Sequence, residues 1–151
     1  MKSCSPTLKE QPFFLLLQLT RQWRRIVERS LRQAGLSDAT WRPLLHLLLL
    51  GDGVWQKDLA ESIGIKGPSL VRLLDTLIDR GLIMRTEDSS DRRAKKLFLT
   101  KTGRQLAEQI HCSVEAIDKR ILQPFSATDM ATMAKYIRCL EDSLNDLSTA
   151  I

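Results

Sequence analysis

Two short stretches of the sequence hold basic side chains that could do chemistry together. The first is "KGPSLVR", in which Lys66 and Arg72 flank Pro68 and Ser69. The second is "SSDRRAKKLFLT", residues 89–100, where a run of cations leads into an apolar segment. Ammonium and guanidinium groups bind phosphates, and a guanidinium can also donate two hydrogen bonds to one guanine. Both stretches therefore suit a polyanion, although a solvated basic loop is the competing interpretation of the second.

No catalytic or metal-binding constellation can be placed in this sequence. It has no glycine-rich phosphate loop and no plausible Ser–His–Asp or His–Cys arrangement. Cys4, Cys112 and Cys139 are odd in number and widely spaced, which argues against a disulfide framework and against a zinc site. We therefore expect no enzyme, no cofactor and no metal. Because Cys112 and Cys139 fall on apolar helices, we expect them to be buried and inert.

The composition describes an ordinary globular chain with an uneven charge distribution. Its 151 residues are 43% hydrophobic and 27% charged, with a formal net charge of +5. Residues 1–50 carry 8 basic and 3 acidic side chains, residues 66–104 carry 10 and 5, and residues 105–151 carry 4 and 7. A basic surface permits nucleic acid, an anionic membrane or an acidic partner. We expect neither a signal peptide nor a membrane span, hence a cytoplasmic protein.

Hydrophobic periodicity predicts five or six helices. Helices are expected at about 13–31, from Ser37 through "WRPLLHLLLL", over "QKDLAESIGI", from Pro68 to about 80, over 103–122, and after Ser126. Pro43 either lies within the second of these or marks a later start for it. The runs "LIMRTE" and "KKLFLT" have strand character and are separated by a loop of hairpin length. The fold class expected is mainly α with one small β-hairpin.

The stretch "QKDLAESIGIKGPSLVRLLD", residues 56–75, fits the helix-turn-helix pattern. Small Ala60 lies where two helices must cross closely, and Gly64 lies in the turn. With a basic hairpin after it, the pattern becomes a winged helix-turn-helix. From about residue 10 to 148 the chain resembles the MarR family of bacterial transcription regulators. The segments "GPSLVRLLDTLIDRGLI" and "DRRAKKLFLT" resemble most closely the SlyA-like branch of that family.

The resemblance implies a fold, an assembly and partners. Residues 1–37 and 101–151 would form a helical dimerisation region, and residues 38–100 the DNA-binding region. A homodimer would place two recognition helices in successive major grooves of a palindromic site, with the wings in the flanking minor grooves. Small aromatic carboxylates or other anionic ligands release many family members from DNA. Repression and activation both stay open, because the sign depends on where the site lies relative to a promoter.

The resemblance also assigns residues. The predicted DNA contacts are Lys66, Pro68, Ser69, Arg72, Arg85, Asp91, Arg92, Arg93, Lys95 and Lys96. Arg72 would read a base or a phosphate, with an ion pair to Asp75 or Asp79 as its structural alternative. One of the two wing arginines would enter a narrow minor groove, and the lysines and Arg85 would neutralise phosphates.

Trp23, Trp41 and His46 fall near the helices that line the ligand cavity of the family. For each of them a plain core position is the competing interpretation. Two rival functions also stay open. One is an oxidant sensor that uses Cys4 or Cys112, and the other is a winged-helix architectural or protein-interaction subunit without a specific operator.

Overall fold

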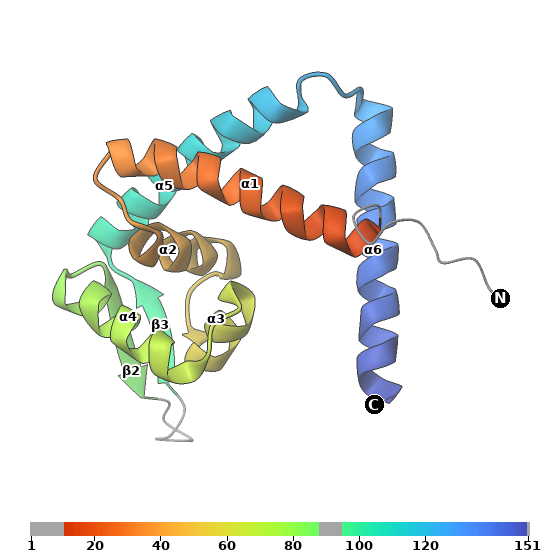
Figure 1. Cartoon of the computed structure of the whole chain (residues 1–151). Helices are drawn as coiled ribbons and strands as arrows, with labels where there is room; N and C mark the ends of the chain where they lie inside the picture. The colour runs from red at the N-terminus through yellow and green to blue at the C-terminus, as the bar shows by residue number, and fades with distance from the viewer. Residues whose placement is uncertain (1–10, 88–94, 151) are drawn as a thin grey trace. The chain divides into compact units, whose positions relative to one another are not determined.

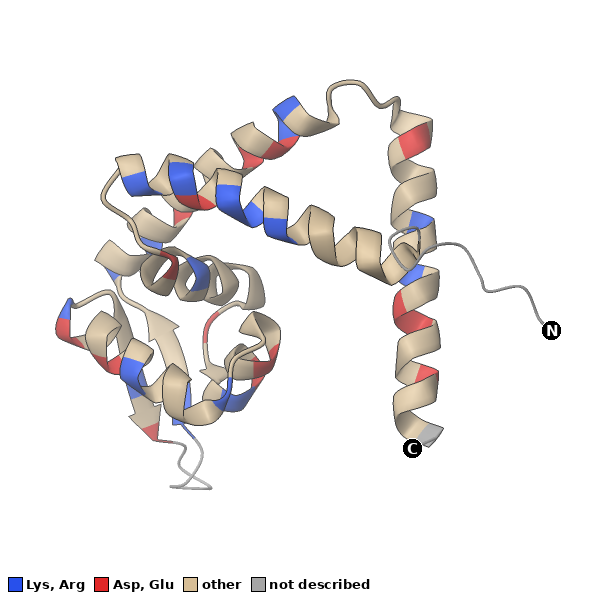
Figure 2. Cartoon of the chain, viewed as in Figure 1, with Lys and Arg blue, Asp and Glu red and all other residues tan. Residues whose placement is uncertain are grey.

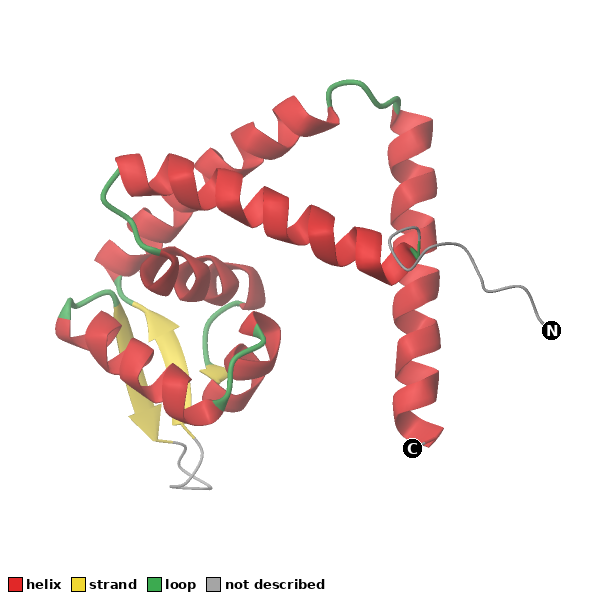
Figure 3. Ribbon diagram, in the orientation of Figure 1, coloured by secondary structure: helices red, strands yellow, loops and turns green. Residues whose placement is uncertain are grey.

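The computed structural model describes residues 11–87 and 95–150, which form six helices and one small sheet (Figure 1, Figure 3). In chain order the elements are α1 (Pro12–Gln33), α2 (Asp38–Leu50), β1 (Val54–Trp55), α3 (Gln56–Ile63), α4 (Gly67–Asp79), β2 (Ile83–Glu87), β3 (Lys95–Leu99), α5 (Lys101–Leu122) and α6 (Ala127–Ala150). The predicted fold class, mainly helical with a small hairpin, is confirmed. The chain divides into two compact units, residues 1–115 and 116–151.

The core of the first unit lies between the sheet and the helices α2, α3 and α4. Its most deeply buried leucines are Leu44, Leu47, Leu59, Leu70, Leu74, Leu77 and Leu97. Burying one such side chain contributes about 1.5–3 kcal/mol. The α1 helix adds Val27 and Leu31 from its C-terminal half, and α5 adds Ile110. This core fixes the orientation of α4, whose buried residues Leu70, Leu74 and Leu77 recur at helical spacing.

The sheet has three antiparallel strands in the order β1-β3-β2. The two long strands are those predicted, with Arg85 opposite Leu97 and Ile83 opposite Leu99. The short strand β1 was not predicted, because two residues carry no periodicity. It pairs Trp55 with Lys96, and the Gly53 N–H donates to the Leu97 carbonyl at 3.1 Å.

Local sequence signals set the end of α1 and the start of α2. Gly35 has φ +76° after α1, and the Leu36 N–H returns to the Leu31 carbonyl at 3.0 Å, which is a Schellman-type ending. The α2 helix begins after Ser37, although the Ser37 hydroxyl forms no capping bond and lies 3.1 Å from that of Thr40. Pro43 lies inside α2, which decides between the two alternatives for this helix.

The start of α5 is a close contact between backbones. Thr100 acts as its cap, since the Gly103 N–H donates to the Thr100 hydroxyl at 3.0 Å and that hydroxyl donates to the Gly81 carbonyl at 2.7 Å. A Cβ atom on Gly103 would lie 1.7 Å from the Leu82 carbonyl oxygen. Only glycine therefore allows α5 to begin so near the end of the turn before β2.

The second unit holds the last turns of α5 and the whole of α6. Ser126 caps α6 as predicted: the Asp129 N–H donates to its hydroxyl at 3.1 Å, and its own N–H donates to the Asp129 carboxylate at 2.9 Å. This reciprocal pair is a capping box. The Ser126 hydroxyl also donates to the Asp129 carboxylate, at 2.7 Å. That bond, and then the bond from the Ser126 N–H, lower the pKa of Asp129. Over residues 127–149 α6 has no buried residue.

Candidate nucleic-acid interface

The helix-turn-helix is built from α3 and α4. Gly64 adopts the left-handed conformation at φ +74°, and the N–H groups of Gly64 and Ile65 both donate to the Ala60 carbonyl, at 2.9 and 3.1 Å. This tight turn reverses the chain so that α4 can begin at Gly67. Pro68 lies in the first turn of α4, where its missing N–H leaves no helical hydrogen bond unmade.

One face of α4 is buried and the opposite face is exposed. Leu70 and Leu74 have no exposed surface, whereas Lys66, Pro68, Ser69 and Arg72 are all exposed. These four predicted contacts therefore lie together, at the start of α4 and in its first two turns. Figure 2 shows basic segments on this helix, on α3 and in a row along α1.

Arg72 is not engaged by the carboxylate that was its structural alternative. Among the described residues, no ion pair involves Arg72. Asp75 instead binds Arg85, with 3.1 Å between the guanidinium and the carboxylate. In the described part of the chain, neither Asp75 nor Asp79 pairs with Arg72, so the structural alternative considered for Arg72 is wrong. The guanidinium of Arg72 projects from an exposed position on the helix.

Arg85 links β2, the first strand of the predicted wing, to α4, the predicted recognition helix. Its side chain is only 27% exposed and joins β2 to α4 through Asp75. The sequence predicted a phosphate contact here, whereas the structure gives the side chain this structural partner.

At the wing, Lys95 and Lys96 begin β3. The Lys96 ammonium lies 4.7 Å from the centre of the Trp55 ring, a cation–π contact across the short strand pair. Trp55 precedes α3 and forms no side-chain capping bond. Asp91, Arg92 and Arg93 lie outside the described residues, so their predicted contacts stay predictions.

Val71 is a surface residue that the sequence reasoning missed. It is 37% exposed and lies between Ser69 and Arg72 on α4. An apolar side chain next to two predicted base contacts, off the leucine stripe, was the signal that could have revealed it. A valine there has the chemistry to contact a thymine methyl group.

The three predicted ligand residues do not share one environment. Trp41 is 2% exposed, with an indole N–H that lacks a hydrogen-bond partner, while Trp23 is half-buried. His46 is half-buried, and its Nδ1 lies 2.6 Å from the Ser62 hydroxyl. Burial and then the nearby Arg42 guanidinium lower the pKa of His46. Two shallow hollows on the described surface, at Leu15–Gln22 and Gln105–Ser113, include none of the three.

Cys112 and Cys139 are exposed, contrary to the expectation that they would be buried. Cys112 lies on α5 and Cys139 on α6, and over residues 127–149 α6 has no buried residue. Cys4 lies outside the described residues. Across residues 11–87 and 95–150, no group of three or more His, Cys, Asp or Glu side chains is placed to hold a metal ion.

The fold and this site together define a winged helix-turn-helix protein. Residues 34–94 match the model of the MarR family. The transcriptional regulator PA3341 is 35% identical over 87% of this chain and 96% of its own, with a TM-score of 0.80. A MarR-family transcriptional regulator from Rhodococcus sp. RHA1 is 28% identical, covering 90% of this chain and 96% of its own with a TM-score of 0.76.

CouR from Rhodococcus jostii RHA1, solved bound to p-coumaroyl-CoA, is 26% identical over 90% of this chain and 95% of its own, with a TM-score of 0.74. The chain belongs to the MarR family and is a transcription regulator of that family. In the described part of the chain, no helix has the length and apolar character needed to cross a membrane.

Proposed function

We propose that this protein is a homodimer that binds a palindromic DNA site through α4 and the wing, and that it acts in the cytoplasm on the chromosome. The observation that carries the proposal is the surface of α4. Its leucine face is held rigidly in the core, while its opposite face presents Arg72 free of ion pairs with the described residues. A rigid helix with an unpaired guanidinium on its outer face suits readout of the major groove.

Each exposed residue of α4 has a proposed role. Arg72 would bind the O6 and N7 atoms of a guanine, and Val71 would contact a thymine methyl group. Pro68 and Ser69 would face the neighbouring bases or sugars at the helix start. Lys66 would bind phosphate, helped by the positive end of the helix dipole, since the first turn of α4 contains no acidic residue.

The wing would extend the contact to the next groove. Lys95 and Lys96 lie at the start of β3 and would bind phosphates. Arg85 would add a phosphate contact only from the part of its side chain left exposed beside its ion pair with Asp75. Arg92 or Arg93 would enter a narrow minor groove, with Asp91 orienting the guanidinium. The loop sequence "DRRAKKLFLT" also supports assignment to the SlyA-like branch.

Apolar residues on the terminal helices support the homodimer. On α1, Phe13, Leu17 and Leu19 are each more than half exposed. On α6, Tyr136, Ile137 and Leu147 are likewise more than half exposed. Apolar surface of this kind is typical of an interface. Residues 1–37 and 101–151 would supply that interface, and residues 38–100 the DNA contacts.

An anionic effector, such as a small aromatic carboxylate, would release the DNA. The proposal rests on the family and on the ligand-bound state of CouR. Trp23, Trp41 and His46 would belong to its binding region, where the unpartnered indole N–H of Trp41 is a buried donor. Salicylate is the first probe to add to a preformed complex.

The test is to select a preferred duplex from a random pool and to compare its affinity with that of a scrambled duplex at several salt concentrations. We expect a palindromic site that binds about 10³-fold or more tightly than the scrambled duplex. Equal affinity for both, collapsing as salt rises, would show a binder of the DNA backbone only. Unchanged affinity in Arg72→Ala and Arg92→Ala would favour the architectural rival.

Because Cys112 is exposed, a cysteine-based oxidant sensor is a second candidate function. Titration with a thiol reagent, before and after treatment with peroxide, counts the reactive thiols of the native protein. Loss of DNA binding together with loss of one thiol would support that function. If peroxide changes neither the thiol count nor the binding, this alternative fails.

A further inference from the structure

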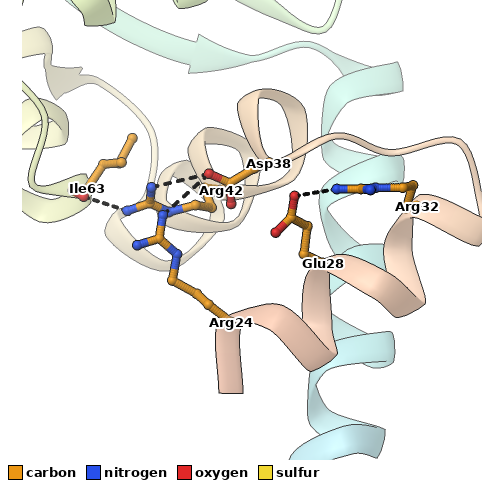
Figure 4. Close-up of polar contacts among 6 residues, drawn as sticks. All are labelled: Arg24, Glu28, Arg32, Asp38, Arg42 and Ile63. Atoms are coloured by element: carbon orange, nitrogen blue, oxygen red, sulfur yellow. Dashed lines mark hydrogen bonds and ion pairs between the residues drawn. The ribbon is translucent and has the colours of Figure 1, made fainter. Parts of the chain in front are cut away.

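Three helices are joined by one small charged cluster in the first unit (Figure 4). Asp38, the first residue of α2, accepts two guanidinium groups at the same carboxylate oxygen. Arg24 of α1 approaches it at 3.4 Å and Arg42 of α2 at 3.5 Å. The second amino group of Arg42 donates to the carbonyl of Ile63 at 2.6 Å. The cluster therefore runs from α1 through the start of α2 to the end of α3.

Ile63 is the place where this contact matters. It is the last residue of α3, so its carbonyl is one of the four that a helix leaves without an internal partner. Gly64 follows in the left-handed conformation, and α4 begins only three residues later. A donor fixed on the Ile63 carbonyl therefore holds the turn from which the recognition helix starts.

Arg42 is suited to this task and not to contact with DNA. Its side chain is 16% exposed, against 42% for Arg24 and 36% for Asp38. A largely buried guanidinium with two partners loses little freedom when it is held. Its hydrogen bond to the Ile63 carbonyl is charge-assisted, a type stronger than a neutral one, and its contact with Asp38 is an ion pair. One helical turn further along α2, the His46 Nδ1 lies 2.6 Å from the Ser62 hydroxyl. The α2 helix therefore contacts the end of α3 at two places.

The end of α4 is tied to the same region of α2. Arg80, which follows the last residue of α4, donates to the Thr40 hydroxyl at 2.9 Å. Thr40 is buried, 5% exposed. The first two turns of α2 thus hold both ends of the segment that presents the recognition helix, and Asp38 adds α1 to the same cluster.

We propose that Arg42 and Asp38 are positioning residues, which set the angle of α4 by holding the turn after Ile63 and couple that angle to α1 through Arg24. The inference rests on the proposed DNA-binding function, which it deepens. Rearrangement of α1 would weaken the hold of Asp38 on Arg42 and loosen the turn. The two functional regions of the chain would then communicate through three side chains and one carbonyl.

The test compares four variants with the wild type: Arg42→Met, Asp38→Asn, Arg24→Gln and the control Arg32→Gln. Arg32 pairs with Glu28 at 2.7 Å within α1, and within the described ranges its side chain links α1 to no second element. It therefore matches the loss of one positive charge without the link. The ratio of affinities for selected and scrambled DNA is measured for each variant. Hydrogen exchange of the Gly64, Ile65 and Leu70 amides is measured in the free protein.

We expect Arg42→Met to lower the affinity ratio about tenfold or more, which corresponds to about 1.4 kcal/mol. Its affinity for scrambled DNA should be unchanged, and the three amides should exchange faster. Asp38→Asn should act in the same direction. Arg24→Gln should lower the ratio about threefold, because its contact is exposed and weak. Arg32→Gln should match the wild type in both measurements.

Several results would overturn the proposal. If the three amides exchange at the wild-type rate in Arg42→Met, the turn does not depend on Arg42. That conclusion holds whatever the ratio of DNA affinities in this variant. Equal behaviour of Arg24→Gln and Arg32→Gln would remove the coupling to α1. Should Arg42→Met fail to fold, Arg42→Lys serves, since its single ammonium group cannot hold both partners, and a wild-type result from it would end the idea. A wild type that does not distinguish the two duplexes instead refutes the proposed function, a separate outcome.

Discussion

At the scale of single residues, some arginines in this chain form ion pairs within the fold, whereas others are available to bind another molecule. Arg104 binds both carboxylate oxygens of Asp52, at 2.7 and 2.8 Å, and Arg85 binds Asp75. Arg72 has no such partner among the described residues. The residue type alone does not distinguish these roles, because each depends on which carboxylate the fold brings near.

This division predicts a contrast between two substitutions. Arg72→Ala should cost about 1–3 kcal/mol of discrimination at one base pair of the selected site, with little change in thermal stability. Lys101→Ala is a fitting control, because Lys101 is also exposed but follows the opposite end of β3 from Lys95. Fluorescence anisotropy with single-base variants of the site measures both. Equal losses in the two variants would mean that Arg72 acts only through its charge.

His46 predicts a dependence of stability on pH. Its pKa is lowered in the folded chain by burial and by Arg42, so the unfolded chain binds the proton more readily. The contribution of His46 to the free energy of unfolding should therefore be fully present above the usual histidine pKa of about 6.5. It should be lost as pH drops toward the lower pKa of the folded chain. Urea denaturation between pH 5 and 7.5, roughly the range in which histidine titrates, measures this slope.

His46→Gln should flatten that slope while it retains a polar partner for Ser62. An unaltered slope in the variant would assign the pH dependence to other groups. Asp129 provides a second and separate window, since its lowered pKa makes its contribution disappear only as pH falls below the usual aspartate range.

At the scale of elements, the junction before α5 depends on one missing side chain. Gly103→Ala would press a methyl group against the Leu82 carbonyl, which cannot move without shifting β2. Overpacking of this kind typically costs about 1–3 kcal/mol, and a backbone contact leaves less room to relax than a side chain does. The melting temperature should fall by several degrees. Circular dichroism measures it.

The control is Gly67→Ala, which also lies at the start of a helix. A Cβ atom there meets nothing, so the variant should keep or slightly raise the melting temperature. If Gly103→Ala is as stable as Gly67→Ala, then α5 shifts without cost and the close approach is not a constraint.

At the scale of the whole molecule, α6 has exposed apolar residues and, over residues 127–149, no buried ones. We expect them to be covered by a second copy of the chain. A double substitution, Leu144→Glu with Leu147→Glu, should convert the dimer to a monomer, because it would bury charges in an apolar interface. Light scattering after size exclusion measures the mass, and Asp142→Lys is the control on the same helix.

The monomeric variant should lose most of its affinity for a palindromic site, since two linked half-sites bind far more tightly than one. A wild type that is already monomeric would contradict the assembly. A variant that remains dimeric would place the interface elsewhere.

The sequence by itself determined the elements and the two faces of α4. Apolar spacing located the helices, Gly64 located the turn between α3 and α4, and the strand-like runs beside the basic segment located β2 and β3. These signals are local, because a turn conformation or a helical stripe depends on residues a few positions apart. Leu70, Leu74 and Leu77 recur at helical spacing and are buried, so Lys66, Ser69 and Arg72 lie on the exposed side.

Only the tertiary structure decided which side chains hold the elements together. The pairs Arg85 with Asp75 and Arg104 with Asp52, the hold of Arg42 on Ile63, and the small strand β1 all join separate elements. No pattern of spacing encodes such contacts, since their geometry arises when the core brings distant segments together. The same reason explains the exposure of Cys112 and Cys139, because the apolar character of a helix does not determine which of its residues the rest of the chain covers.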